Sequence, residues 1–593
     1  VLDTAGGLTV ASASSSGGNV TVATTGNLIV NDAAIQAGAG DVSLTATGGN
    51  ITSVTVNGTA DVVGNLVTLT TTGAGTIGTA GSPLEVNGTS LTATTAGGVL
   101  NVLDTAGGLT VANAASSGGN VTLATTGNLI VNGGAVNAGA GNVGLTATGG
   151  NVTSATIDGA ADVIGAAVTL TTTGGGSIGS SGNPLEINGA TLTATTAGGS
   201  VDVLDTAGGL SLTSLNSNGG NVALTGAAGT LTVAGAATAG AGTFTLTSDA
   251  LSIGALVTGN GGLTVRPRTA GTTIGLGGAA GAFTLTGADV QNLSSTTGLT
   301  LGSASAGALT VGTLTAGNTQ NQNVALVSGS TINDSAAGAA VSTTGTLTLT
   351  SAGAIGGASF GGDGFTSNVG TLAVTSTGGN NLTLTDTGAS GATFLQSILT
   401  GGAGTISLTK TTSNFTLGAF STTGNSNVTA SAGSLLDGPG AGIMTAGGAG
   451  VLTATTGTIG DNVTPIGVNF TGTLTTIATG VVGGVSVNVN GAAGGNALIY
   501  PANTPGKVLF NAVTLNPPLV SVGGGGGSSA VSNAPRFTSS QMQAADTVTQ
   551  QLVKAVSTLS GPRIGAFDLE GLLDDILGGG PMFSILDGGA LQP

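Results

Sequence analysis

An eight-residue phrase that returns at a fixed distance constrains this chain more than any other feature. It reads VLDTAGGL from Val1 and returns at Val102 and at Val203. The period is about 101 residues, and the first two copies agree at roughly 73 of 101 positions. The third copy keeps its register to about residue 247. After that the match to the repeat weakens, but aliphatic residues still alternate with Thr or Ser. Such a chain is expected to stack similar units rather than to form unrelated globular domains.

A shorter unit lies inside the long repeat. Its copies start mostly at a Gly, Asn or Asp turn and continue with aliphatic residues that alternate with Thr or Ser, as at 18–22, 40–44 and 66–70. They recur roughly every 20–25 residues. This alternation places Val, Leu and Ile on one face of a strand and Thr on the other. The shorter unit is therefore expected to be a strand with its turn.

One unit is too short to bury its apolar face, but stacked units share a continuous core. We therefore predict an all-β fold, a right-handed parallel β-helix (solenoid) with coils about 4.8 Å apart and a short helical C-terminal tail. A solenoid that reached residue 515 would hold about 25 coils. The alternative is a row of β-sandwich domains, but these would need linkers and aromatic cores, and the first aromatic residue is Phe244.

The sequence divides into four parts. Tandem repeats cover 1–247, diverged coils cover 248–515, a Pro/Gly/Ser-rich linker covers 516–535, and a helical tail covers 536–593. Two prolines at 517 and 518 should end the ladder, since proline donates no backbone hydrogen bond. In the first part we expect the following side chains to point inward: Val20, Val22, Val42, Leu44, Val67 and Leu69.

Composition excludes several kinds of chemistry. The chain has no His and no Cys, which removes ordinary zinc, haem, iron–sulfur and thiol sites and any Ser-His-Asp triad. Only 7 Lys and Arg stand against 24 Asp and Glu, so the net charge is −17. Nucleic-acid binding needs a basic surface, and we expect none here. We likewise expect no cofactor and no metal site.

The acidic residues recur with the long repeat, as Asp3, Asp104 and Asp205 do. Members of this set are about five coils apart, near 24 Å, and cannot act together. The same separation applies to two other sets: Asp61 with Asp162, and Glu85 with Glu186. We interpret them as turn or surface groups of the repeat. The chain is therefore not expected to be an enzyme, and no catalytic residue is assigned.

Two segments are candidates for assembly. The first strand, with Leu8, Thr9 and Val10, opens inside a repeat without a capping element, so its edge is predicted to pair with another subunit. Apolar residues at helical spacing in the tail form a candidate docking helix, with a cap on the solenoid as the simpler reading. Its residues are Met542, Ala545, Val548, Leu552, Val556 and Leu559.

Several short phrases of this chain form a characteristic set. They are IG at 178–179 with NPLEI at 183–187 and LTATTAGG at 192–199, then VRPR at 265–268 with TIGLGG at 273–278, and LGSA at 301–304 with AG at 306–307. These phrases resemble the repeats of filamentous-haemagglutinin-like large exoproteins. The resemblance covers roughly 1–515. It implies a right-handed β-helix fibre that an outer-membrane transporter exports to the Gram-negative cell surface, where it serves adhesion or biofilm. The family's N-terminal secretion domain is not recognisable in this chain.

These observations favour a secreted, structural or adhesive fibre at the outer cell surface, which can also self-associate into a homopolymer. Host or surface glycans and proteins are the expected partners. A second hypothesis is ice binding, since Thr-x-Thr phrases such as 68–70 and 383–385 are frequent. A third is a glycan-cleaving β-helix enzyme, for which the acids are too sparse and too far apart.

Overall fold

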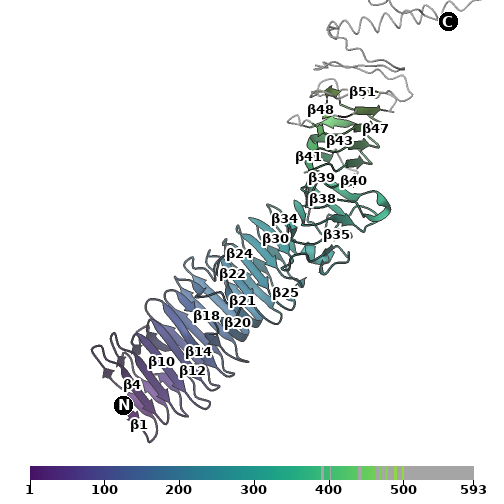
Figure 1. Cartoon of the computed structure of the whole chain (residues 1–593). Coiled ribbons are helices and arrows are strands. Elements are labelled where there is room, and N and C mark those ends of the chain that lie inside the picture. The colour runs from purple at the N-terminus through teal and green to yellow at the C-terminus, as the bar shows by residue number, and fades with distance from the viewer. Residues whose placement is uncertain are drawn as a thin grey trace, which may run out of the picture.

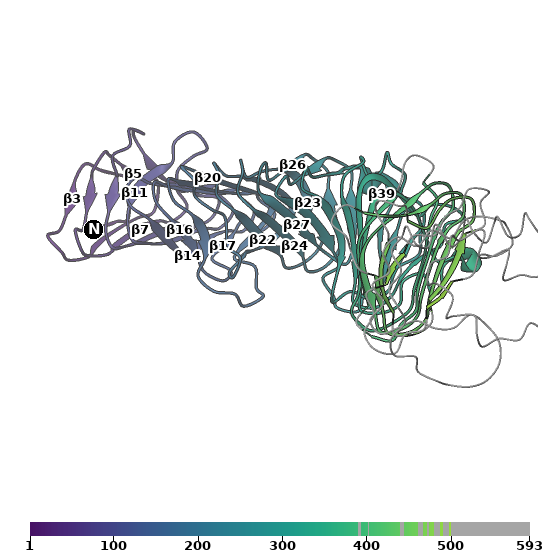
Figure 2. The same cartoon turned by 90° about the horizontal axis from the view of Figure 1, so that it is seen from above.

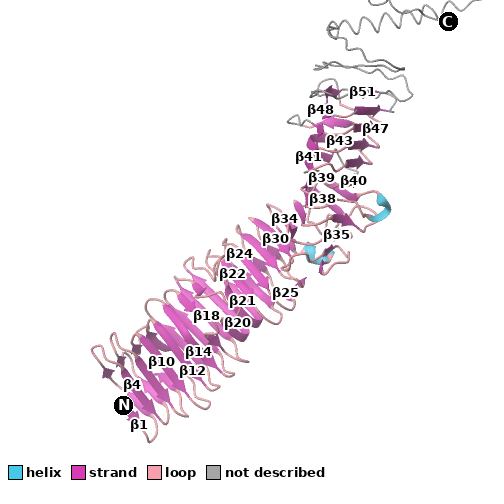
Figure 3. Ribbon diagram, in the orientation of Figure 1, coloured by secondary structure: helices cyan, strands magenta, loops and turns pink. Residues whose placement is uncertain are grey.

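The chain forms a parallel β-solenoid of about 20 turns with about 2% helix (Figures 1 and 3). The computed structural model describes residues 1–388, 393–400, 402–438, 444–460, 466–470, 472, 474–478, 487–489 and 497–499. The prediction of an all-β solenoid is confirmed. The predicted linker, the tail with its docking residues and the coils beyond 499 lie outside the described residues. In the part of the chain that is described, no helix is long and apolar enough to cross a membrane.

The first coils have one side of long strands and two sides of short strands. The long side contains β1 (Leu2–Asp3), β4 (Val20–Thr24), β7 (Val42–Ala46), β10 (Leu66–Thr71) and β12 (Ser90–Thr95). The second side contains β2 (Leu8–Val10), β5 (Leu28–Val30) and β8 (Ile51–Ser53). The third side contains β3 (Ala13–Ser14), β6 (Ile35–Gln36), β9 (Val62–Val63) and β11 (Leu84–Asn87).

Stacked strands place apolar residues above one another. On the long side, Val20 pairs with Val42, Val42 with Val67, and Val67 with Leu91. These steps of 22, 25 and 24 residues show that successive coils differ slightly in length. The predicted inward side chains are buried, at 1% exposure or less, except that of Val20. Val20 is only half-buried because β1 covers Ala23 and Thr24 but does not reach it.

The long repeat is not a whole number of coils. The row that begins at Val20 continues through Val42, Val67 and Leu91 to Val111. Val121, the counterpart of Val20, stacks instead on the row of Leu28, Ile51, Ile77 and Leu100. The repeat therefore spans four coils and part of a fifth, and equivalent residues of successive copies lie on different sides of the rod. The expected separation of about five coils between equivalent residues is close to the observed one. The rotation of each copy about the rod axis was not predicted.

The side of long strands moves with this rotation. β14 (Leu109–Ser116) stacks on β12 as one long strand. On its other side it pairs with two short strands of the next coil, β16 (Leu129–Val131) and β17 (Val136–Asn137). The new long side passes through β13 (Leu100–Asp104), β15 (Val121–Thr125), β18 (Val143–Thr148) and β20 (Val163–Thr173). The solenoid continues through β19 (Val152–Ser154), β21 (Leu185–Thr195), β22 (Val201–Asp205), β23 (Ser211–Asn216), β24 (Val222–Gly226), β25 (Leu231–Val233), β26 (Ala237–Thr238), β27 (Thr243–Thr247), β28 (Leu251–Ile253), β29 (Val257–Thr258) and β30 (Gly262–Arg266).

The rod changes direction where one coil is much longer than the rest (Figure 1). Leu263 pairs with Leu299, so this coil runs from 263 to 299. Its extra length holds β31 (Ile274–Leu276), β32 (Phe283–Leu285) and the short helix α1 (Gly287–Gln291). β31 and β32 form a separate sheet with β35 (Leu309–Val311) and β37 (Ile332–Asp334). The other strands of the bend are β33 (Leu293–Ser294), β34 (Leu299–Ser303), β36 (Val324–Ser328) and β38 (Val341–Ser351).

Beyond the bend the interior includes rings that the first repeats lack. Buried Phe365, Phe415 and Phe420 contrast with the aliphatic coils before Phe244. A 3-10 turn at Phe360–Gly362 precedes β39 (Phe365–Ser376). The described strands that follow are β40 (Leu382–Asp386), β41 (Thr393–Thr400), β42 (Ile406–Lys410), β43 (Phe415–Thr422), β44 (Ser426–Ala430), β45 (Leu435–Asp437), β46 (Met444–Ala446), β47 (Gly450–Ala454), β48 (Ile466–Phe470), β49 (Leu474–Ala478), β50 (Val487–Val489) and β51 (Ala497–Ile499).

One corner of the rod requires glycine because successive coils approach closely there. A Cβ built on Gly75 would lie 2.1 Å from the carbonyl oxygen of Gly49, and one on Gly98 would lie 2.0 Å from that of Gly75. Real Cβ atoms do not come this near backbone atoms. Steric exclusion along this column accounts for part of the high glycine content.

Candidate functional site

The recurring acidic residues lie inside the rod. The side chains of Asp61, Glu85 and Asp104 are fully buried, and so are those of Asp162, Glu186 and Asp205 one repeat later. Our interpretation of them as turn or surface groups was therefore wrong; only Asp3, in the first coil, stays partly exposed. The chain tolerates buried carboxylates because backbone N–H groups or hydroxyls reach most of them.

Glu85 holds a protruding loop at 54–60. Its two carboxylate oxygens accept hydrogen bonds from the backbone N–H groups of Asn57, at 3.0 Å, and Gly58, at 2.7 Å. Asp61, at the end of this loop, accepts a 3.1 Å bond from the backbone N–H of Glu85. The carboxylates thus replace the partners that the loop backbone would otherwise find in a strand.

The second repeat builds the same arrangement. Glu186 accepts from the N–H groups of Asp158 and Gly159 at 3.2 and 3.0 Å, and Asp162 accepts from that of Glu186 at 3.0 Å. Recurrence of these three hydrogen bonds from backbone N–H groups shows that the pair of acids belongs to the loop's architecture. The two loops are one rotated repeat apart, so they leave the rod on different sides. Figure 2 shows one loop rising near β5 and β11 and another descending near β17.

Burial perturbs the ionisation of these carboxyls. Desolvation raises the pKa of Asp61 to about 6, and the negative charge of Glu85 adds to the rise. Desolvation also raises the pKa of Asp162 to about 6, with Glu186 in the same role. The pKa values of Asp202 and Asp205 rise to about 6 through burial. These groups titrate near neutral pH in a chain that has no histidine.

A second polar motif is an Asp carboxylate that accepts a hydrogen bond from a Thr hydroxyl in the next coil. Its third copy lacks the threonine. The hydroxyl of Thr24 donates to Asp3 at 3.0 Å, and that of Thr125 donates to Asp104 at 2.8 Å. At the third position of the series, Asp205 stands opposite Gly226, which has no hydroxyl. Neither oxygen of the Asp205 carboxylate has a hydrogen-bond partner of normal geometry among the described residues.

The sequence held a signal for the acid pairs. Asp61 and Glu85 are 24 residues apart, and so are Asp162 and Glu186. This is the step from Val67 to Leu91, one coil of the rod. The period of 101 residues relates each acid to its copy in the next repeat and does not show its acidic neighbour in the next coil. Among the described residues, no group of three or more Asp or Glu is arranged to hold a metal ion.

The outer surface of the two loops is partly apolar. Val54 and Val56 of the first loop and Ile157 of the second are exposed. In the first repeat the amide of Asn57 donates to Asp32. In the second, Asp158 replaces the asparagine and Gly133 replaces the aspartate, so that two carboxylates do not meet. The loops thus keep their shape although their sequences differ.

The predicted assembly edge lies at the first end of the rod. β2, which contains Leu8, Thr9 and Val10, pairs with β5 on one side and has no strand on its other side among the described residues. Val10 is nearly buried, Leu8 is half-buried and Thr9 is exposed. Val1 and Leu2 beside it are also exposed. Among the described residues, this edge therefore presents main-chain groups that pair with no strand, beside apolar surface.

An open hollow of about 480 Å³ lies over the strands of the bend. It crosses β30, β34, β36 and β38, and it was not anticipated from the sequence. Its polar side chains are neutral: Thr264, Thr297, Thr300, Asn323, Thr346 and Thr348. Hydroxyl and amide groups of this kind can exchange hydrogen bonds with a neutral polar ligand.

Comparisons of the chain with family models, with curated proteins and with solved structures found no match. The resemblance to filamentous-haemagglutinin-like exoproteins therefore stays a sequence-based expectation. The fold and the surfaces described above are the basis for any assignment of function.

Proposed function

We propose that this chain is a structural and adhesive part of an extracellular fibre, a stiff rod at a Gram-negative-type cell surface. The observation that carries the proposal is the solenoid itself, which passes from β1 to β51 with one shared core. About 20 turns at about 4.8 Å per coil give a contour of roughly 100 Å. A rod of this length suits a spacer that holds contacts away from its point of attachment.

Electron microscopy of the purified chain tests the rod. Deletion of residues 102–202 joins Asn101 to Val203, the counterpart of Val102, so the local sequence at the junction is kept. Because the deletion removes four coils and part of a fifth, the rod should shorten by roughly 22 Å and fold normally. An unchanged length or a collapsed particle would contradict the proposal.

The hollow at the bend is our candidate for the adhesive contact, with a neutral glycan as its ligand. Beads coated with the chain should bind glycan-bearing surfaces more strongly than albumin-coated beads do. Thr300→Arg fills the hollow and should reduce binding at least several-fold, whereas Thr70→Arg, on an outward position of β10, should not. If coated beads bind no better than albumin beads, the adhesive part of the proposal fails and the structural rod remains.

We also propose that the outer edge of β2, which pairs with no strand among the described residues, pairs with a coil of another copy and gives a head-to-tail homopolymer. Main-chain bonds at an open strand edge favour such addition. The double change Thr9→Pro and Val10→Lys removes a donor and places a charge at the edge. Light scattering should then show smaller particles than for the parent chain. Equal particle sizes for both, at high concentration, would contradict self-assembly.

Ice binding is the second candidate, and the outward threonine rows are the observation that favours it. Thr68 lies beside Thr92 in the next coil, and Thr70 lies beside Thr94. The rows then end at Asn113 and Ala115 of β14. A row this short would order little water, so the candidate predicts a small thermal hysteresis, and a measurement that shows none would exclude it and leave the fibre.

A further inference from the structure

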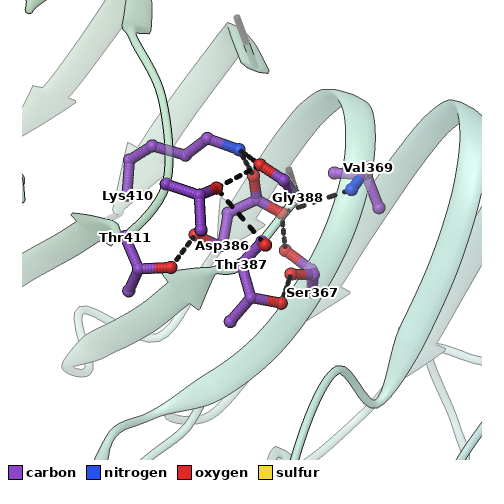
Figure 4. Close-up of polar contacts among 8 residues, drawn as sticks. Ser367, Val369, Asp386, Thr387, Gly388, Lys410 and Thr411 are labelled. Atoms are coloured by element: carbon purple, nitrogen blue, oxygen red, sulfur yellow. Dashed lines mark hydrogen bonds and ion pairs between the residues drawn. The ribbon is translucent and has the colours of Figure 1, made fainter. Parts of the chain in front are cut away.

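An ion pair lies inside the rod beyond the bend. The Nζ atom of Lys410 is 2.5 Å from Oδ2 of Asp386, and the two side chains are 1% and 0% exposed. The residues end β42 and β40, which are neighbouring coils, and they are direct partners in the ladder. Figure 4 shows both side chains turned toward each other between the strands.

The two oxygens of the Asp386 carboxylate have different partners. Oδ2 contacts Lys410, and Oδ1 contacts two other donors. Oδ1 accepts from the hydroxyl of Ser367 at 3.0 Å and from the backbone N–H of Val369 at 3.2 Å. Nζ of Lys410 also donates to the carbonyl oxygen of Gly388 at 2.8 Å. These contacts fix the amine against the carboxyl group (Figure 4).

Burial makes this pair costly as two charges. Each ion loses its hydration, and the attraction between them returns only part of that free energy. Transfer of one proton from Nζ to Oδ2 removes both charges and leaves an amine beside a carboxylic acid. The amine is held 2.5 Å from Oδ2, and Cγ is the atom bonded to that oxygen, so the amine has the proximity that speeds nucleophilic addition.

We propose that Lys410 and Asp386 condense to an amide that links two coils covalently. The lone pair of Nζ attacks Cγ of Asp386, and a C–N bond forms. Negative charge then develops on Oδ1, where Ser367 and Val369 donate hydrogen bonds as an oxyanion hole does. A proton passes from nitrogen to Oδ2, the C–Oδ2 bond breaks, and one water molecule leaves. Ammonium and carboxylate thus become amide and water, with no co-reactant.

The cross-link closes a loop of one coil. Asp386 and Lys410 are paired across adjacent coils, and the bond between them runs along the rod axis, parallel to the ladder hydrogen bonds. Tension along the axis pulls directly on those hydrogen bonds, which open in turn. A covalent bond between the coils prevents this coil from opening. The inference concerns the chemistry of the pair and does not depend on the proposed function.

Mass spectrometry of the folded full chain tests the proposal. The intact protein should be lighter than its sequence by one water molecule. Trypsin cuts after Lys410 only when its amine is free, so digestion should yield a single peptide that runs from Thr269 to Lys507. Fragmentation of that peptide should show residues 386 and 410 joined.

Variants sharpen the test. Lys410→Met and Asp386→Ala should each restore the full mass expected for their sequences. Ser367→Ala keeps both reacting groups but removes one donor to Oδ1, so the linked fraction should grow at least ten-fold more slowly after refolding. A parent chain of full mass with free cleavage after Lys410 would overturn the proposal. Loss of water that maps to an Asp-Gly site, such as Asp158–Gly159, would overturn it equally.

Discussion

The second and third copies of the long repeat are similar in sequence, but they differ in how they satisfy one polar group in their interiors. Asp104 in the second copy has the hydroxyl of Thr125, whereas Asp205, one period later in the third copy, faces Gly226 and has no such donor. The loops that Glu85 and Glu186 hold are, by contrast, alike in the first and second copies. The comparison teaches that each interior polar group depends on the coil directly beside it. A solenoid can therefore lose one contact without loss of its fold.

The largest loss of stability is expected at the glycine corner, where coils approach equally closely in the first and second copies of the repeat. Gly98→Ala places a methyl group 2.0 Å from the Gly75 carbonyl, and Gly199→Ala places one 1.9 Å from that of Gly176. The coils must separate at this corner, which should cost about 3 kcal/mol or more in either repeat. Thermal melting with region-resolved hydrogen exchange measures the loss.

Gly81→Ala is the matched control for the corner. A Cβ at Gly81 meets no atom within 4 Å, and its counterpart Gly182 is equally open. This change should leave stability within about 0.5 kcal/mol of the parent chain. If Gly98→Ala melts like Gly81→Ala, the coils are not as close at the corner as described.

The second effect is a dependence of stability on pH. A carboxyl whose pKa is raised by folding favours the folded chain when it is protonated. This stabilisation is full below pH 3.8, the ordinary value, and is lost as the pH rises through about 6 for Asp61, Asp162, Asp202 and Asp205. The rod should therefore melt at a higher temperature at pH 5 than at pH 8. Histidine cannot contribute, because the chain has none.

The pH effect should also distinguish the repeats. Asp205→Asn removes a carboxyl that lacks a threonine donor and should reduce the pH dependence of hydrogen exchange around β22 and β24, where Asp202 remains. The pH dependence of hydrogen exchange around β9 should persist in this variant, because Asp61 is unchanged. A chain whose stability rises from pH 5 to pH 8 would contradict the burial of these groups.

A smaller effect is expected from Glu85→Gln. The carboxylate accepts two backbone N–H groups of the loop at 54–60, and the amide keeps only one acceptor oxygen. The loop should open more often, by about 1 kcal/mol, and exchange its amide hydrogens faster. Glu186→Gln should do the same at 155–161 and leave 54–60 unchanged. Equal exchange in both loops for either variant would show that the acids do not hold them.

Most of the fold followed from alternation in the sequence. The period of two and the recurring turns identify strands, and Val42, Leu44, Val67 and Leu69 point inward as expected. The rotation between repeats was not predictable from the long period alone. Coils of unequal length do not divide it evenly, and only strand pairing shows where each coil closes.

The interior polar groups were harder to anticipate. Charged residues are seldom fully buried, so Asp61 and Glu85 were assigned to the surface. Their burial depends on backbone N–H groups of a loop, whose path the sequence does not specify. Lys410 and Asp386 are separated by one coil in the same way, but without the length of that coil their spacing predicts no contact. Both pairs share one sequence signal, a spacing of 24 residues between two ionisable side chains.

The smallest effect concerns the site where the second and third copies of the repeat differ. Gly226→Thr places at Asp205 the hydroxyl that Thr125 gives to Asp104. The backbone of Gly226 has no positive φ, and a Cβ there would lie 3.1 Å from the Ser248 hydroxyl, so a small shift of that side chain makes room. The new bond should stabilise the rod by about 1 kcal/mol and lower the pKa of Asp205.

The converse change belongs in the second copy of the repeat. Thr125→Val keeps the volume of the side chain but removes its hydroxyl, and it should destabilise the coil by a similar amount and raise the pKa of Asp104 further. Hydrogen exchange around β24 and β15 at pH 5 and pH 8 reports both variants. If Gly226→Thr weakens the coil at both pH values, the shift of Ser248 costs more than the hydrogen bond returns. The missing threonine is then an adaptation to Ser248 rather than a lost contact.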